Sequence, residues 1–381
     1  MKILHLITGL GYGGAESMLL NLLSHFRKEG IENHVVSLTG DGPTGQQIRA
    51  QGIPVETLNM SRGRFSISGF QKLLQIIQKT RPDVLQTWLY HADLVGGLTR
   101  LAGSQVPVVW GVHHTARALH LLKPSTRFVI RVNCMISHFL PSRIICCSES
   151  AYQSHLAMGY PAGKMHIIPN GVDAVRFRPD IASRIALRRQ LGVAEDTVLI
   201  GHSGRFVPAK GHALFIRAAW ILHQSYPDVH FVMCGKEVEP GNSRLWEWIM
   251  TAGLSSQVHL LGPLPNLEKM LQGLDFFVSS SMSEALPLTV AEAMACQIPC
   301  VVTDAGDQGM LIGDTGILVP SESAAALADG CCQMLAMPES QRHSLGHAAR
   351  TRILEAYALE EAARRYFEVY QQLLEACTDC L

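Results

Sequence analysis

The sequence carries little charge and no excess of either sign. Charged residues make up 17% of its 381 residues, and 32 Lys and Arg balance 32 Asp and Glu. Because nucleic-acid binders usually show a basic excess, we expect no nucleic-acid partner. Hydrophobic residues reach 47%, which is enough for sizeable cores and excludes disorder as the main character of the chain.

Long apolar runs, a disulfide framework and metal-ligand clusters are also missing from the sequence. No stretch approaches the roughly 20 apolar residues that a membrane-spanning helix needs, and the run Lys2–Ile7 is too short for the core of a signal peptide. The ten Cys are scattered, and the one C-x-x-C, Cys377–Cys380, has no second Cys or His pair at zinc spacing. We therefore expect a cytoplasmic protein with reduced thiols and no metal.

Charge is unevenly divided between the two halves. Residues 1–170 hold 16 basic and 8 acidic residues, and residues 171–381 hold 16 and 24, so the net charges are +8 and −8. In the first half Arg62–Phe65 precedes a predicted helix, and Lys123, Arg127 and Arg131 recur every four residues among apolar side chains. Such stripes suit an anionic membrane surface or a lipid-linked phosphate, and a solvated helix face is the open alternative.

Short apolar runs alternate with amphipathic stretches, and the alternation starts twice. The strands predicted in the first half are Ile3–Ile7, His34–Leu38, Val84–Gln86, Val106–Trp110, Ile144–Cys147 and His166–Ile168. Those predicted in the second half are Val198–Ser203, Val229–Cys234, Val258–Leu261, Asp275–Ser279, Cys300–Thr303 and Ile317–Val319. Helical patterns separate these runs, which is typical of α/β domains. The sequence therefore predicts two Rossmann-like domains, each with a doubly wound parallel sheet.

We expect the domains to face each other across a cleft, with ligands beyond the carboxyl ends of the strands. The first domain is predicted over 1–170 and the second over 196–357. The range 171–195 is rich in Pro, Gly and charge, which is typical of a linker. The tail 358–381 is predicted as a helix that can cross back to the first domain.

A glycine-rich loop follows the first predicted strand. Gly9, Gly11 and Gly14 match G-x-G-x-x-G and precede a predicted helix. A bare backbone at a helix N-terminus can approach a diphosphate or a sugar. A tight turn and a nicotinamide-dinucleotide site are the alternatives. The second predicted strand ends without the acid that a nicotinamide site needs for the ribose, so the latter is the weaker alternative.

Two loops of the second half contain the charged residues best suited to bind a substrate. Arg205 and Lys210 follow a strand and flank Pro208, so two cations can converge on one anion, although a solvated loop is possible. Further on, Glu284 lies in a polar loop, and Glu292 comes eight residues later within a predicted helix. Backbone amides at the start of that helix would face an anion. Together the two loops predict a site for a phosphate-bearing ligand with hydroxyl groups.

With these motifs the chain resembles the retaining GT-B glycosyltransferases of family four, the group 1 type, over nearly its whole length. The resemblance rests on the glycine-rich loop, the pair His113-His114, "IIPNGVD" at 167–173, "GRFVPAKG" at 204–211, and the two glutamates. It implies that the second domain binds a nucleotide-diphosphate sugar and that the first domain binds the acceptor.

The resemblance also implies a role for each matched residue. The implied catalytic residues are His113, Arg205, Lys210 and Glu284. The implied donor-binding residues are Gly13, Gly14, Arg205, Lys210, Glu284, Leu288, Thr289 and Glu292. Whether His113 or its neighbour His114 faces the sugar stays open. The chain departs from the family at Ala285, at Met310, where the family often has Glu, and at Gln297, where a positive φ would cost on the order of 1 kcal/mol.

The implied reaction is a retaining, metal-independent hexosyl transfer without a cofactor. By family habit the acceptor is a glycan or a lipid-linked molecule of cell-envelope polysaccharide synthesis. Negative charge that grows on the leaving diphosphate would be stabilised by Arg205, Lys210 and the helix amides. The alternatives are a GT-B nucleotide-sugar epimerase and a non-catalytic nucleotide-sugar-binding protein. A nicotinamide oxidoreductase would leave both glutamates and both cations unexplained.

Overall fold

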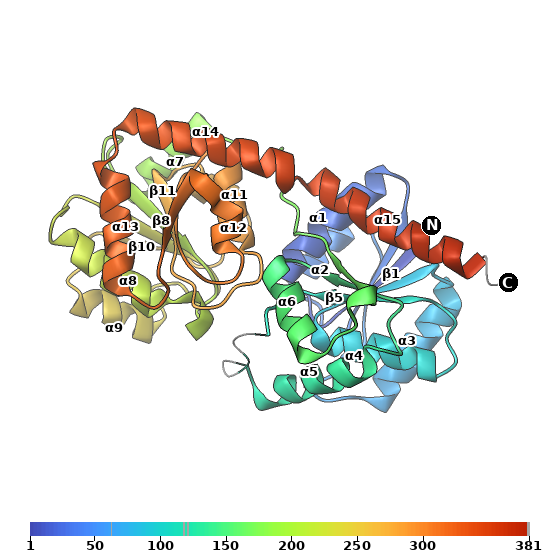
Figure 1. The fold of residues 1–381 in the computed structure, drawn as a ribbon. Coiled ribbons are helices and arrows are strands. Elements are labelled where there is room, and N and C mark those ends of the chain that lie inside the picture. Colours follow the sequence, from blue (N-terminus) through green and yellow to red (C-terminus); the bar gives the residue numbers. More distant parts are fainter. Residues whose placement is uncertain (62, 117–118, 120–121, 379–381) are drawn as a thin grey trace. The chain divides into compact units, whose positions relative to one another are not determined.

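The computed structural model describes residues 1–61, 63–116, 119 and 122–378, with side chains as far as residue 376. The chain divides into two compact units (Figure 1). Unit 1 comprises Met1–Gly171 and the C-terminal stretch that begins at Leu359. Unit 2 comprises Val172–Ala358. Each unit is built around its own parallel sheet, which confirms the predicted fold class of two Rossmann-like α/β domains.

Unit 1 has a seven-stranded sheet in the order β3-β2-β1-β4-β5-β6-β7. The strands are β1 (Lys2–Ile7), β2 (Glu32–Ser37), β3 (Val55–Thr57), β4 (Val84–Trp88), β5 (Val108–Val112), β6 (Arg143–Cys146) and β7 (Met165–Ile167). The helices are α1 (Gly14–Lys28), α2 (Pro43–Ala50), α3 (Ile67–Thr80), α4 (Tyr90–Leu101), α5 (Pro124–Ile136), α6 (Glu149–Met158) and α15 (Leu359–Thr378). The central strands β4 and β5 are buried throughout, because helices cover both faces of a parallel sheet.

Unit 2 has a six-stranded sheet in the order β10-β9-β8-β11-β12-β13. The strands are β8 (Leu199–Ser203), β9 (His230–Cys234), β10 (Val258–Leu260), β11 (Phe276–Ser279), β12 (Cys300–Thr303) and β13 (Gly316–Val319). The helices are α7 (Ile181–Leu191), α8 (His212–His223), α9 (Ser243–Thr251), α10 (Leu267–Leu271), α11 (Leu288–Ala295), α12 (Gln308–Ile312), α13 (Ala324–Ala336) and α14 (Glu339–Ala356). The strand order reverses between β8 and β11, and the loops after these two strands carry Arg205, Lys210 and Glu284.

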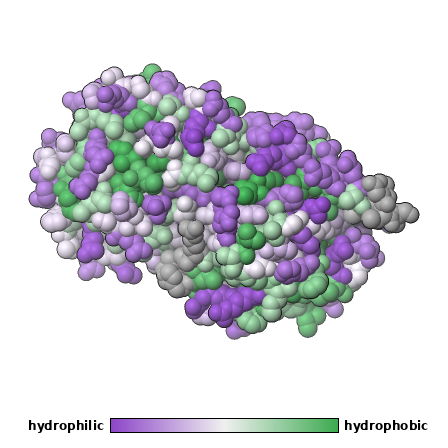
Figure 2. Space-filling view, in the orientation of Figure 1, coloured by the Kyte–Doolittle hydropathy of each residue, from purple (hydrophilic) through white to green (hydrophobic). Residues whose placement is uncertain are grey.

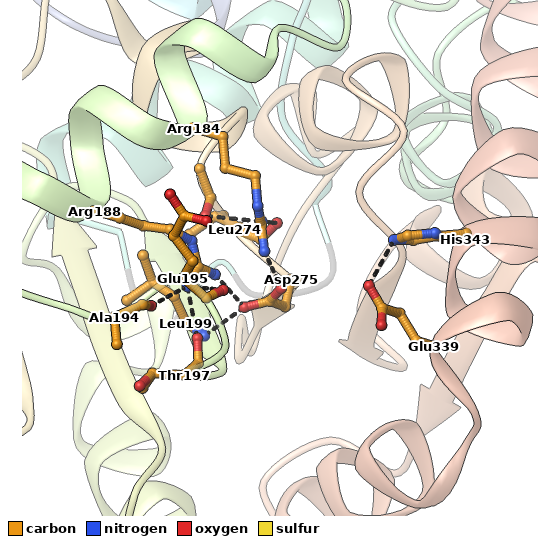
Figure 3. A network of polar contacts seen from close by, with 11 residues as sticks. Arg184, Arg188, Ala194, Glu195, Thr197, Leu199, Leu274, Asp275, Glu339 and His343 are labelled. Atoms are coloured by element: carbon orange, nitrogen blue, oxygen red, sulfur yellow. Dashed lines mark hydrogen bonds and ion pairs between the residues drawn. The ribbon is translucent and has the colours of Figure 1, made fainter.

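Residues 172–195 are a packed part of unit 2, which differs from the linker predicted over 171–195. They contain α7, whose Leu187 lies in the core of unit 2. Arg188, only 2% exposed, binds the Asp275 carboxylate at 2.5 Å, and Arg184 binds the other oxygen at 2.7 Å (Figure 3). The charged residues whose number indicated a linker therefore form ion pairs that hold α7 against the start of β11.

The C-terminal helix α15 belongs to unit 1 and packs against α1. Tyr366 and Tyr370 on this helix are fully buried, and the Tyr370 hydroxyl donates to Oε1 of Gln86 on β4 at 2.8 Å. The amphipathic tail thus completes the core of unit 1 with residues from the far end of the chain.

None of the helices in the described part of the chain is long and apolar enough to cross a membrane. Eight of the ten cysteines are described, and all eight are free thiols. The side chains of Cys377 and Cys380 lie outside the described residues. Burial raises the pKa of the Cys146 thiol, which makes it unreactive in the folded protein.

Gln297 has a φ of 63°, in the left-handed region that favours glycine. Its side chain forms a hydrogen bond with His347, at 3.0 Å on the surface. We expect Gln297→Gly to raise the free energy of unfolding by about 1 kcal/mol, because the backbone strain is relieved. Urea denaturation checks this, with Gln297→Ala as the control: it keeps the strain and loses the hydrogen bond. A Gly variant no more stable than the Ala variant would contradict the expectation.

Candidate active site

Two loops of unit 2 form one hydrogen-bonded block beyond the carboxyl ends of β8 and β11. The Ser280 hydroxyl donates to the carbonyl oxygens of Lys210 and Gly211 at 3.0 Å, and the Met282 amide donates to Ala209 at 2.8 Å. Gly211 has a φ of 65°, and a Cβ there would lie 1.9 Å from the Ser280 carbonyl oxygen. Only glycine fits this close approach, so the first loop is held in place by the second.

Lys210 and Glu284 meet inside this block. The Lys210 ammonium forms an ion pair with Oε1 of Glu284, and the Ser281 hydroxyl donates to the same oxygen at 2.7 Å. The Lys210 side chain is 25% exposed and that of Glu284 is 11% exposed, so both remain accessible to a ligand. Arg205 is exposed at the start of the first loop and forms no ion pair with any described residue. The block therefore offers one uncommitted cation and one paired cation beside a carboxylate.

The N-terminus of α11 adds two free backbone donors. Pro287 occupies the N-cap position and supplies no side-chain hydrogen bond. The amides of Val290 and Ala291 bond back to the Pro287 carbonyl, whereas those of Leu288 and Thr289 have no acceptor among the described residues. Free amides at a helix start bind anions well, because the helix dipole adds to their hydrogen bonds.

Glu292 lies one turn further along α11 and is almost completely buried. Its side chain makes no hydrogen bond to the described residues. Burial raises its pKa to about 8, and the nearby Arg176 guanidinium opposes this rise. An unsatisfied carboxyl that keeps 7% of its surface exposed is suited to receive hydroxyl donors from a ligand.

The pKa of Glu292 predicts a pH effect on stability. A carboxyl with a folded pKa near 8 and an unfolded value of 4.5 holds its proton more tightly in the folded state, so stability falls as pH rises between these values. Glu292→Gln should remove this loss, and its advantage over the parent protein should grow by on the order of 1 kcal/mol per pH unit. Urea denaturation at pH 5, 6, 7 and 8 checks this. A constant difference across that range, as expected for the exposed control Glu247→Gln, would refute it.

The glycine-rich loop of unit 1 joins β1 to α1. Gly13 is the N-cap of α1, without a side-chain hydrogen bond, and a Cβ on Gly13 would lie 2.4 Å from the Glu16 carboxylate. Gly14 is exposed with open space around it. The Thr44 hydroxyl donates to the Gly11 carbonyl at 2.6 Å and holds the loop from the side. The helix start is thus open at Gly14, whereas the Glu16 carboxylate lies close to Gly13.

His113 and His114 differ sharply in environment. His113 follows β5 directly, is 9% exposed, and stacks on Trp88 with ring centroids 4.9 Å apart. Burial lowers its pKa to about 3, so its imidazole is neutral. The side chain of the buried Asn170 lies beside the ring, and its hydrogen bond to His113 opposes this fall in pKa. His114 is exposed and lies beside Tyr90.

The structure joins two of the residues predicted in unit 2, Lys210 and Glu284, and places Arg205 in the loop after β8 and Glu292 in the helix that follows β11. The predicted residues of unit 1 lie after the strands β1 and β5 of their own sheet. Sequence reasoning gave no role to Asn170 or Ser281. Asn170 lies within "IIPNGVD", and Ser281 lies in a run of serines. Both residues lie in motifs that the sequence shows. The side chains that they contact, His113 for Asn170 and Glu284 for Ser281, became visible only in the fold.

Comparison with known proteins identifies the family of the chain. The family described as glycosyl transferases group 1 matches residues 183–352, and the family described as Glycosyltransferase Family 4 matches residues 12–176. The chain belongs to the group 1 glycosyltransferases. The two matches fall on units 2 and 1 almost completely.

Relatives of this glycosyltransferase occur among curated proteins and solved structures. It is 26% identical to UDP-Gal:alpha-D-GlcNAc-diphosphoundecaprenol alpha-1,3-galactosyltransferase of Escherichia coli, over 70% of this chain and 68% of that protein. It is 30% identical to D-inositol 3-phosphate glycosyltransferase of Pseudarthrobacter chlorophenolicus, over 71% and 66%. The fold is similar to Anabaena Alr3699/HepE in complex with UDP and glucose, with a TM-score of 0.86, 22% identity, and coverage of 98% and 100%.

One departure from the group 1 pattern is visible at α12. Met310 lies where the family often has Glu, and it offers a thioether in place of a carboxylate. Its side chain is 54% exposed. The turn before it still supports the site: Gly306 has a φ of 60°, and a Cβ there would lie 2.0 Å from the Glu284 carbonyl oxygen. This glycosyltransferase thus keeps the backbone that packs under Glu284 while losing the acid beyond it.

Proposed function

We propose that this chain is a retaining, metal-independent hexosyltransferase. It moves a sugar from a nucleotide-diphosphate sugar to a glycan or lipid-linked acceptor in cell-envelope polysaccharide synthesis. The observation that carries the proposal is a cluster in unit 2: the Lys210–Glu284 ion pair joins the loops after β8 and β11, Arg205 lies in the first of these loops, and the free amides of α11 follow the second. The name of the Escherichia coli relative, with its UDP-sugar donor and diphospholipid acceptor, supports the same chemistry.

The cluster supplies positive charge where the reaction creates negative charge. When the bond between the anomeric carbon and the diphosphate oxygen breaks, the electron pair leaves with the diphosphate. Arg205, Lys210 and the amides of Leu288 and Thr289 would stabilise this charge. Glu292 would accept hydrogen bonds from the ribose hydroxyls, and Glu284 would accept them from the transferred sugar. Gly13, Gly14 and His113 are assigned to the phosphate, acceptor and sugar contacts of unit 1.

A panel of nucleotide sugars tests the proposal. UDP-, GDP- and ADP-sugars are screened by thermal shift, and each stabilising donor is then incubated with lipid-linked and glycan acceptors in excess chelator. We expect transfer with an unchanged anomeric configuration by NMR of the product. Release of an epimer or free sugar without an acceptor would favour the epimerase, and binding without turnover would favour a non-catalytic protein. Loss of transfer in chelator would refute metal independence.

A basic, apolar surface of unit 1 would bring the enzyme to an anionic membrane. Residues 57–148 contain eleven Lys and Arg but only two acids, one of which, Asp93, is buried. Lys123, the N-cap residue of α5, and Arg131 and Phe128 on α5 are exposed, Phe128 to 67%. Figure 2 shows hydrophobic residues directly beside hydrophilic ones over this part of unit 1. This mixture favours the interface of an anionic bilayer.

Arg131→Glu should therefore lower co-sedimentation with vesicles of phosphatidylglycerol and phosphatidylcholine by about 5-fold or more, because it replaces attraction with repulsion. Vesicles of phosphatidylcholine alone give the baseline. Arg217→Glu, an exposed charge reversal in unit 2, is the matched control. Binding that ignores lipid charge, or equal binding of both variants, would remove the membrane from the proposal.

A further inference from the structure

Three aromatic rings from distant parts of the chain form one stack in unit 1. His113, after β5, lies on one face of Trp88 on β4, with centroids 4.9 Å apart and planes 18° apart. Tyr366 of α15 also stacks on Trp88, at 6.0 Å and 16°. Trp88 and Tyr366 are both fully buried. We call this set the aromatic pillar: it leads from the C-terminal helix to the histidine assigned to the sugar.

The edge of Trp88 is held by a chain of hydrogen bonds. The indole N–H donates to Nδ1 of His5 at 3.3 Å, and Nε2 of His5 lies 3.0 Å from Oδ1 of Asn33. The Asn33 amide in turn donates to the Ile31 carbonyl at 2.9 Å. Because Nδ1 accepts, the neutral ring of His5 must carry its proton on Nε2 and donate it to Asn33. Every donor in the chain has an acceptor, so the plane of Trp88 is fixed.

The His113 ring has one polar neighbour among the described residues that acts on its pKa through a hydrogen bond, the side chain of Asn170. Asn170 holds the edge of the ring, and stacking on Trp88 sets the plane of the ring. A ring without such support would rotate about its side-chain bonds. Small losses of alignment at a reacting centre have large effects on rate.

We propose that Trp88 and Tyr366 position His113, so that the C-terminal helix α15 acts as a supporting element of the active site. The inference deepens the proposed function, because it rests on the assignment of His113 to the reacting sugar. Tyr366 and Trp88 are positioning residues, and only His113 would touch the substrate. The packing of α15 against the core of unit 1 would thereby set the orientation of the His113 ring.

The first experiment separates turnover from binding. Tyr366→Leu should lower kcat by about 10-fold, with little change in the KM of the donor. Tyr366→Phe keeps the ring and should retain nearly full activity, because the Tyr366 hydroxyl has no hydrogen-bond partner in the part of the chain that the structure describes. Leu373→Ala is the matched control, since it removes a buried side chain of the same helix outside the pillar. If Leu373→Ala lowers kcat as much as Tyr366→Leu, the role is merely structural and the proposal fails.

The second experiment does not depend on activity. In the protein labelled with 15N- and 13C-histidine, the signal of His113 is identified by its loss in His113→Asn. Tyr366→Leu should shift the His113 ring signals, because His113 lies in the ring current of Trp88, whereas Leu373→Ala should leave them in place. Unshifted signals in Tyr366→Leu would overturn the pillar. An intact pillar in a protein that transfers no sugar would instead refute the proposed function.

Discussion

Replacing Lys210 with alanine should lower kcat/KM for the nucleotide-sugar donor by about 10- to 100-fold. Lys210 is the cation that pairs with Glu284, and a charge-assisted hydrogen bond to a diphosphate contributes roughly 1.5–3 kcal/mol. Loss of this bond matters most when the diphosphate gains charge, so kcat should fall more than the affinity for the donor. The expectation rests on the proposed role of the cluster in unit 2.

Steady-state kinetics with a saturating acceptor measure this effect. Lys269→Ala removes an exposed lysine of unit 2 without a recorded ion pair and is the control. Lys210→Arg keeps the charge and should recover part of the rate. Glu284→Gln also breaks the ion pair but keeps the charge of Lys210. It therefore separates the effect of that charge on the diphosphate from the effect of the ion pair on the structure. If Lys210→Ala keeps the parent kcat/KM and shows only a lower melting temperature, Lys210 is structural and the diphosphate binds elsewhere.

Asp275→Ala should lower the free energy of unfolding of unit 2 by about 3–5 kcal/mol, because it leaves a buried guanidinium without its counter-charge. Asp275 binds Arg188 at 2.5 Å and Arg184 at 2.7 Å, and it also accepts the Leu199 amide at 2.6 Å. One carboxylate thus ties α7 to the starts of β8 and β11 (Figure 3).

Urea denaturation followed by fluorescence and circular dichroism measures the loss. Asp196→Ala, an exposed carboxylate just before β8, is the control and should change stability by less than about 0.5 kcal/mol. The double variant Asp275→Ala/Arg188→Met should recover part of the stability, because it removes the unpaired buried charge. A single variant within about 0.5 kcal/mol of the parent protein would contradict the buried-charge argument.

The strands were predicted well because their signal is local. Runs such as Ile3–Ile7 and Val229–Cys234 are apolar, and β1 and β9 lie within a residue of them. The three-residue strand β3 was missed because Val55–Thr57 is too short for a periodic pattern. Helix α7 was missed because its sequence is polar, and its Arg side chains have a partner, Asp275, that lies far away along the chain.

For the candidate site, too, the sequence indicated the residues and the fold supplied their contacts. The sequence indicated Arg205, Lys210, Glu284 and Glu292, because each lies in a loop or helix start whose chemistry can be recognised locally. The ion pair between Lys210 and Glu284 could not be predicted, since it joins side chains 74 residues apart. The raised pKa of Glu292 likewise depends on burial by the surrounding fold.

By itself, then, the sequence determined the α/β alternation and the family motifs, because these depend on neighbouring residues. Only the tertiary structure decided that α7 belongs to unit 2, that His113 is buried and His114 exposed, and that Tyr366 lies on Trp88. Burial and long-range contact are properties of the packed chain, and no local pattern encodes which distant side chain will supply the partner.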